Sequence, residues 1–117
     1  MAEIKTVNEY NLVEGIVTSI IHNDEETAKH FADAKAAFVA GQVAHKEADA
    51  YQMEGDSDLM SVCRAYADAK RKMYQGHMRK AADRIMTLTG LPKDEVVDIL
   101  SMYACEVITD ALIEAGM

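Results

Sequence analysis

The chain has 117 residues, one Pro, no Trp and a formal net charge of −8, which is enough length for one domain that buries roughly two thirds of its unfolded surface. Scarce Pro and abundant Ala, Met, Glu and Lys favour an all-α fold. No apolar run approaches the roughly 20 residues that cross a bilayer, and the first residues lack the apolar core of a signal peptide. We therefore expect a single all-helical domain, 1–117, in the cytoplasm and not in a membrane.

The first predicted helix covers residues 7–22. Thr6 and Glu9 have the spacing of a capping box, in which their side chains bind the first free backbone amides. Asn23 and Asp24 then end this helix and begin the next one. The helix carries an apolar stripe that is wider than the usual third of its circumference. This stripe contains Tyr10, Leu12, Val13, Ile16, Val17, Ile20 and Ile21.

Two long helices, 24–54 and 57–89, are predicted next, joined by a polar turn around Gly55. In each helix a large residue recurs every seven positions, and a small residue follows three positions later. In the first long helix the large positions are Phe31, Phe38, His45 and Gln52, and the small ones are Ala34, Gly41 and Ala48. In the second, the large positions are Leu59, Tyr66 and Met73, and the small ones are Val62, Ala69 and Gly76.

These positions predict the contact between the two long helices. If the helices are antiparallel, large residues face small ones wherever the residue numbers sum to 114, so that Phe38 faces Gly76 and His45 faces Ala69. Gly41 and Gly76 each cost about 1 kcal/mol relative to Ala inside a helix, so we attribute both to close approach of the two backbones. The sequence thus predicts a long antiparallel helical hairpin with His45 packed inside it.

A fourth helix, 92–115, is predicted to begin at Pro92, after Gly90 ends the preceding helix. Apolar residues cover almost its whole circumference, so it needs neighbours on more than one side. Either a monomeric bundle encloses it, or a second subunit covers part of it. We expect the second arrangement, a self-associating four-helix protein that forms a homo-oligomer through its first and last helices.

Charge is distributed unevenly along the chain. Residues 64–84 contain seven of the twelve basic residues and two acidic ones, a net charge of +5, whereas the remainder carries −13. We place six of these seven basic side chains, all except Lys80, on the outer face of the 57–89 helix. There they are either solvated or bind a small anionic ligand such as a nucleotide, or an acidic protein partner. Generic duplex DNA is not an expected partner, because the acidic remainder repels it. The candidate ligand- or partner-binding residues are Lys70, Arg71, Tyr74, Arg79, Lys80 and Arg84.

No catalytic residue, metal ligand or cofactor is predicted. Glu26 and His30 lie one helical turn apart, but the Glu-x-x-His motifs that bind two irons in helical bundles do not occur. Phosphate-binding Gly-rich loops and nucleophile motifs are also missing from the sequence. Cys63 and Cys105 are predicted to be buried free thiols.

No motif in the sequence indicates a known family. The size, charge and helical pattern favour a small, non-catalytic protein–protein interaction or regulatory module, such as an adaptor or inhibitor. The first alternative is an oligomeric binder of a small anionic ligand at the basic face. The second alternative is a metal-dependent helical-bundle enzyme.

Overall fold

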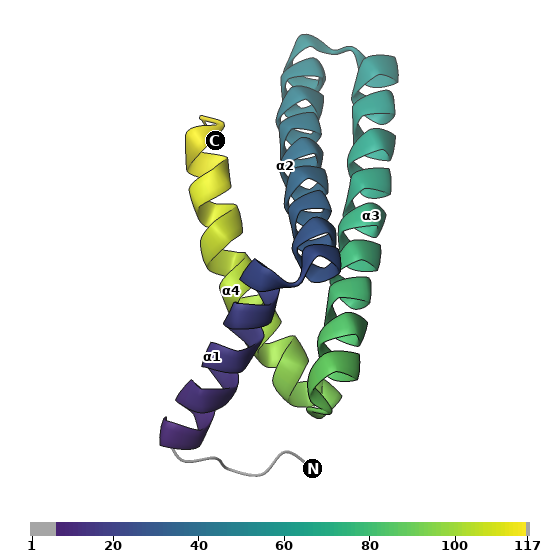
Figure 1. Ribbon diagram of the computed structural model, residues 1–117. Helices are drawn as coiled ribbons and strands as arrows, with labels where there is room; N and C mark the ends of the chain where they lie inside the picture. Colours follow the sequence, from purple (N-terminus) through teal and green to yellow (C-terminus); the bar gives the residue numbers. More distant parts are fainter. Residues whose placement is uncertain (1–6, 117) are drawn as a thin grey trace.

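The computed structural model describes residues 7–116, and this range is all-α, with four helices and no strand (Figure 1). The helices are α1 (Val7–Asn23), α2 (Glu25–Glu54), α3 (Ser57–Thr89) and α4 (Lys93–Glu114). Each boundary lies within one residue of the predicted one. The predicted capping box begins at Thr6, which lies outside the described residues.

Local signals determine where the two long helices begin and end. Asp24 precedes α2, and its carboxylate accepts hydrogen bonds from the backbone N and the hydroxyl of Thr27, at 3.0 and 2.7 Å. Asp56 accepts a hydrogen bond in the same way from the first turn of α3. Both helices end at a glycine in the left-handed region, Gly55 at φ 81° and Gly90 at φ 71°. Since other residues are strained in this conformation, glycine is the natural residue at both stops.

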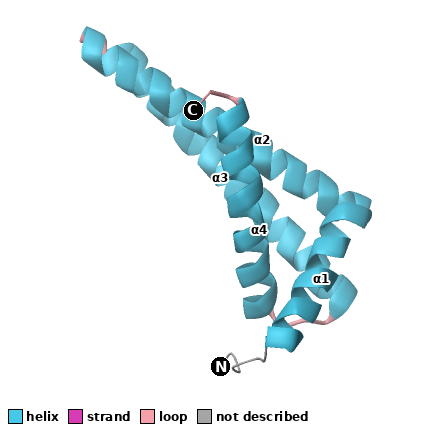
Figure 2. Cartoon of the chain, turned by 90° about the vertical axis from the view of Figure 1, so that its left-hand side faces the viewer, coloured by secondary structure: helices cyan, strands magenta, loops and turns pink. Residues whose placement is uncertain are grey.

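The four helices form an elongated molecule rather than a compact bundle. Helices α2 and α3 lie side by side in opposite directions, and α1 and α4 pack near the end of this pair that is remote from the 55–56 turn (Figures 1 and 2). The molecule measures 53 × 29 × 24 Å and has a radius of gyration of 17.0 Å. A compact chain of this length has a radius of gyration of about 13 Å. We call residues 40–73, which include the 55–56 turn, the distal hairpin.

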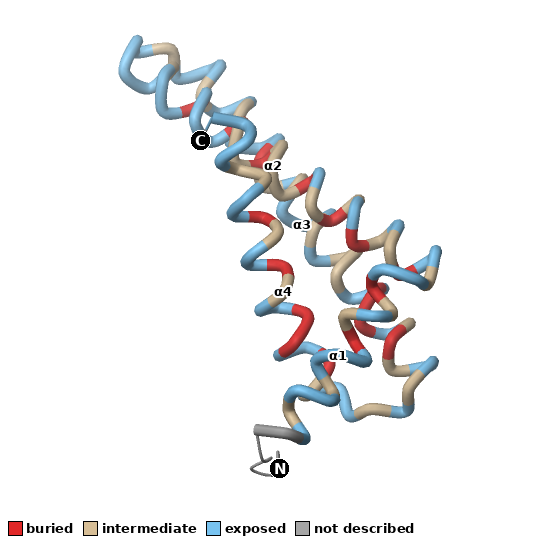
Figure 3. The backbone as a smooth tube through the Cα atoms, turned by 60° about the vertical axis from the view of Figure 1, so that its left-hand side comes forward, coloured by how far each residue is buried: buried red, intermediate tan, exposed pale blue. Residues whose placement is uncertain are grey.

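At the other end of the hairpin, all four helices contribute to a core of mostly large apolar side chains, here called the proximal core. Figure 3 marks the buried positions of the chain in red along the backbone. Ile85 of α3, Val17 of α1 and Val96 of α4 are fully buried in it. The Phe31 ring of α2 packs against the Tyr103 ring of α4, with centroids 5.3 Å apart. The buried members are Val17, Ile21, Phe31, Ala81, Ala82, Ile85, Val96, Ile99, Leu100, Ala104 and Ile108.

The residues buried in the distal hairpin are small. Gly41, Ala44 and Ala48 of α2 face α3, where Ala67 is buried. A Cβ atom at Gly41 would lie 3.5 Å from the Ala67 carbonyl oxygen, so the helices do approach closely there. A Cβ atom at Gly76 would have no neighbour within 4 Å among the described residues outside its own helical turn. Close approach of α2 therefore does not account for Gly76, and that prediction is wrong.

The residues that were predicted to pair between α2 and α3 do not face each other. The Phe38 ring packs against the Tyr74 ring, with centroids 5.1 Å apart, instead of facing Gly76. His45 was predicted to pack inside the hairpin, but it is exposed. The face of α3 that α2 covers contains Ala67 and Tyr74, each one position beyond a predicted contact residue.

The proximal core explains this rotation of α3. Positions 67, 74, 81 and 85 lie on one helical face, and this face brings Ala81 and Ile85 into contact with the other helices. The predicted face, which contains Tyr66 and Met73, continues to Lys80. Burial of Lys80 would remove water from its charge, which is unfavourable. The fold therefore buries the face with Ala81 and Ile85, and the face with Tyr66, Met73 and Lys80 stays exposed.

Candidate interaction surface

The six predicted binding residues of α3 do not form one surface. Lys70, Tyr74 and Arg84 are half-buried on the side of α3 that faces α2. The other three lie on exposed sides of the helix. These exposed residues are Arg71, Arg79 and Lys80.

Arg84 connects α3 to the beginning of α2. Its guanidinium forms ion pairs with the carboxylates of Asp24 and Glu26, each at 3.2 Å. The hydrogen bond from Arg84, together with those from Thr27, lowers the pKa of Asp24 well below its usual range, and the same Asp24 contact raises the pKa of Arg84. Arg84 was predicted on the outer face of the helix, but it forms this partly exposed contact between α3 and the start of α2.

Tyr74 and Lys70 also contribute to packing. The Tyr74 ring contacts Phe38 edge-on, and burial raises the pKa of its phenol. The Lys70 Cβ lies 3.5 Å from the place that a Gly41 Cβ would occupy, and its ammonium lies 5.2 Å from the centroid of the Tyr66 ring. Packing against α2 leaves Tyr74 only partly available for stacking on a ligand.

Arg79 and Lys80 are exposed basic side chains that form no ion pair among the described residues. Asp68 binds Arg71 at 2.8 Å and Lys72 at 3.4 Å, and the Arg71 hydrogen bond and the nearby Lys72 charge lower the pKa of Asp68. Within the described part of the chain, neither Arg79 nor Lys80 has a carboxylate at ion-pair distance. Their charges are therefore free to act on something outside the chain.

Sequence reasoning missed an exposed apolar surface of the distal hairpin. The heptad residues of α3 that were predicted to face α2 lie to one side of it, and we call them the α3 stripe. Their exposed fractions are 43% for Leu59, 65% for Val62, 50% for Tyr66 and 46% for Met73. The periodicity that identified an apolar stripe was informative, but it was assigned to the wrong neighbour. The α3 stripe consists of Leu59, Val62, Tyr66, Ala69, Met73 and Gly76.

A shallow apolar groove between α2 and α3 adjoins the α3 stripe. The two helices contribute similar numbers of side chains to it, and Glu47 is its only charged residue. The remaining lining residues are Ala40, Val43 and Ala44 of α2, and Val62, Cys63 and Tyr66 of α3.

An acidic group lies at the turn end of the distal hairpin. Glu54, Asp56 and Asp58 surround a polar hollow at the turn between α2 and α3. Arg79 and Lys80 are located in α3 beyond the other end of the α3 stripe. The α3 stripe thus has negative charges at the end near the turn and positive charges at the opposite end.

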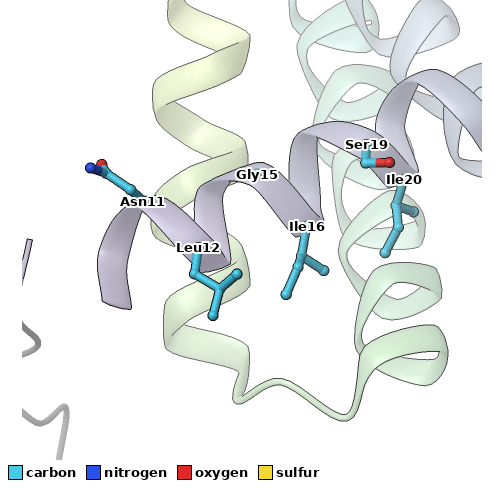
Figure 4. Close-up of a pocket in the computed structure, with 6 residues that line it drawn as sticks. All are labelled: Asn11, Leu12, Gly15, Ile16, Ser19 and Ile20. Atoms are coloured by element: carbon cyan, nitrogen blue, oxygen red, sulfur yellow. The ribbon is translucent and has the colours of Figure 1, made fainter. Parts of the chain in front are cut away.

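A second apolar surface occurs on α1. Figure 4 shows Leu12, Ile16 and Ile20 pointing to the same side of the helix, where they line a shallow pocket with Gly15. Leu12 is 66% exposed. Helix α4 covers a different side of α1, where the Tyr10 hydroxyl donates a hydrogen bond of 2.9 Å to the sulfur of Met102.

The structure offers few polar clusters that could support chemistry. Among the described residues, no group of three or more His, Cys, Asp and Glu side chains is placed to hold a metal ion. His30 and His77 bring their Nδ1 atoms to 3.4 Å between α2 and α3. Both cysteines are free, with Cys63 half-buried and Cys105 exposed, so the predicted burial of Cys105 is wrong.

None of the helices in residues 7–116 has both the length and the apolar character needed to cross a bilayer. Comparison with protein-family models, with curated proteins and with solved structures finds no match to this chain.

Proposed function

We propose that the chain is a self-associating, non-catalytic helical interaction module that acts in the cytoplasm as an adaptor or inhibitor of another protein. One observation carries this proposal. In the distal hairpin the small side chains are buried, whereas Leu59, Val62 and Tyr66 are exposed. Because large apolar side chains gain most from burial, this inverted arrangement favours a surface that a second protein chain covers.

The area of the molecule supports the same proposal. The chain exposes 7633 Å², whereas a compact monomer of 12.9 kDa exposes roughly 6,300 Å². The excess of about 1,300 Å² is larger than the roughly 800 Å² that each partner contributes to a standard protein interface. One protein contact on each chain is therefore compatible with the exposed area.

The first and last helices form part of the proposal as a contact between subunits. Helix α4 packs on α1, α2 and α3, so the chain itself covers part of the apolar excess of α4. Leu12 and Ile16 of α1 and Val97 and Met102 of α4 are nevertheless exposed. These side chains support a homo-oligomer contact through α1 and α4.

The small-anion alternative has less support from the geometry. It requires basic side chains that converge on one ligand, but Arg84 is engaged by Asp24 and Lys70 packs beside Gly41. Tyr74 is packed against Phe38. We therefore do not propose a nucleotide site.

Native mass spectrometry of the purified chain tests the proposal, because it reports subunit number and retained ligands together. We expect a species at a multiple of 12.9 kDa without added mass. A monomer whose mass exceeds 12.9 kDa by the mass of a bound phosphate compound would support the small-anion alternative. A bare monomer at the highest soluble concentration would contradict self-association.

A further inference from the structure

We propose that the α3 stripe binds the α3 stripe of a second copy of this chain in an antiparallel, two-fold symmetric contact. The inference deepens the proposed function, because it names a surface through which the chain associates with itself. In this contact, residues of the two copies face each other where their numbers sum to 135. A two-fold axis then passes between positions 67 and 68.

The sizes of the side chains fit this arrangement. A symmetric contact requires a surface to be complementary to itself, and the α3 stripe satisfies this condition because each pair joins a larger and a smaller residue. Each of the three residue pairs occurs twice because of the two-fold symmetry, so the contact contains six paired layers. These layers extend along about 26 Å of helix at 1.5 Å per residue. The pairs are Leu59 with the partner's Gly76, Val62 with the partner's Met73, and Tyr66 with the partner's Ala69.

The contact also explains Gly76. A glycine inside a helix costs about 1 kcal/mol relative to alanine, and a Cβ at Gly76 would meet no described atom within 4 Å beyond its own turn of the helix. Packing within residues 7–116 therefore does not require a glycine at this position. Against the partner's Leu59, the missing side chain provides the space that this larger residue needs.

Charge favours the antiparallel direction. The acidic turn with Glu54, Asp56 and Asp58 then lies next to the partner's Arg79 and Lys80, and the two-fold axis repeats this match at the other end. A parallel contact would place each acidic turn beside the partner's acidic turn and each Arg79 beside the partner's Arg79. Opposite charges at the ends of the α3 stripe thus support one direction and oppose the other.

Cysteine cross-linking tests the pairing directly. The background chain carries Cys63→Ala and Cys105→Ser, and the test variant adds Leu59→Cys and Gly76→Cys. Because Cys is smaller than Leu, the changed pair still fits, and paired Cα atoms at about 4.4 to 6.8 Å permit a disulfide. We expect oxidation of the test variant to give a covalent dimer on a non-reducing gel, whereas Leu59→Cys alone gives little.

Two results of the cross-linking would overturn the inference. Efficient linking by Leu59→Cys alone would show a parallel contact, in which position 59 meets its own copy. An unlinked test variant, in a chain that native mass spectrometry shows to be oligomeric, would place the self-contact elsewhere. The second result would leave the proposed function standing.

Analytical ultracentrifugation of a matched pair tests the α3 stripe in solution. Val62→Glu introduces a charge into the α3 stripe, and Gln75→Glu introduces the same charge on an exposed position of α3 away from it. We expect Val62→Glu to raise the dimer dissociation constant by roughly 100-fold or more, because the charge would be buried without a partner. We expect Gln75→Glu to change it by less than about threefold.

The fold should survive in both variants, since the two positions are exposed in the single chain, and circular dichroism checks this. Equal dissociation constants for Val62→Glu and Gln75→Glu would overturn the inference. If Leu12→Glu dissociated the oligomer and Val62→Glu did not, the contact would belong to α1 and α4. The proposed function would then stand without the α3 contact.

A charge exchange tests the direction of the contact. Asp58→Arg alone and Arg79→Asp alone should each weaken the dimer, because like charges then meet at both ends. The double variant carries both changes in each subunit and should return the dissociation constant to within about threefold of the original value. Additive weakening in the double variant would contradict the antiparallel contact.

Discussion

The proximal core and the distal hairpin use the same pair of helices in opposite ways. In the proximal core, α2 and α3 bury large residues such as Phe31 and Ile85 against α1 and α4. In the distal hairpin they bury Gly41, Ala44 and Ala67, and large apolar residues stay exposed. The contrast shows that the chain completes one end of the hairpin by itself and leaves the other end with uncovered apolar surface.

The difference has an energetic consequence. Burial of apolar area contributes about 25 cal/mol per Å², so the proximal core should supply most of the stability of the single chain. Small side chains bring two helices close together but bury little area. The distal hairpin should therefore open more readily than the rest of the molecule unless a partner covers it.

Truncation of the proximal core should have the largest effect. Ile85 is fully buried, and Ile85→Ala should lower the free energy of unfolding by about 2 to 5 kcal/mol, because it removes apolar contacts and leaves a cavity. Urea unfolding measures this change. The control is Leu88→Ala, at a position 47% exposed on the same helix, and it should cost less than about 1 kcal/mol. Equal losses would contradict the assignment of stability to the proximal core.

Overpacking should disturb the distal hairpin next most strongly. Ala48 is fully buried between α2 and α3, so Ala48→Leu should push the helices apart and cost about 1 to 3 kcal/mol. Hydrogen exchange should show the opening in residues 40–73 and leave the proximal core protected. Ala50→Leu, at an exposed position of α2, is the control and should be nearly neutral. Opening of both regions together would show that they form one cooperative unit.

These two regions also differ in how far their structure could be predicted from the sequence. The helix ends were predicted within one residue because Asp24, Gly55, Asp56 and Gly90 act on their own neighbours in the chain. The residues of α3 near one another in the sequence do not determine which face of the helix packs against α2. Two apolar stripes lie next to each other on this helix, and contacts of Ile85 in the proximal core select between them.

The candidate site shows the same limit. The cluster of basic residues in α3 was visible in the sequence, but its partners were not, because Arg84 binds Asp24 across 60 positions of the chain. Conversely, the periodicity of Tyr66 and Met73 correctly indicated an apolar stripe. It could not indicate whether the neighbour of that stripe was α2 or a surface outside the chain.

Substitution of two glycines, Gly76 and Gly41, distinguishes packing within the chain from packing between two chains. Gly76→Ala should stabilise the dilute monomer by up to about 1 kcal/mol, since alanine favours the helix and a Cβ meets no neighbour at this position. The same change should weaken the dimer roughly tenfold by crowding the partner's Leu59. Gly41→Ala should gain less in the monomer, because its Cβ would contact Ala67 and Lys70 at 3.5 Å. Thermal unfolding and sedimentation measure the two effects, and a tighter dimer for Gly76→Ala would count against the proposed contact.

The smallest expected effect concerns acid stability, and it tests whether one ion pair helps to hold the proximal end together. Because Arg84 and Thr27 lower the pKa of Asp24 in the folded chain, the stability from this carboxylate is present above its unfolded pKa of about 3.9. This contribution decreases as the pH falls through the lower, folded pKa.

In Arg84→Gln the folded pKa of Asp24 moves back toward its usual value, so stability should fall less between about pH 5 and pH 2 than in the original chain. Arg71→Gln is the control, because Arg71 pairs with the more exposed Asp68 within α3, and urea midpoints across this pH range measure both. If Arg84→Gln lost stability with acid as steeply as the original chain, the contact with Asp24 would not contribute to the junction of α2 and α3.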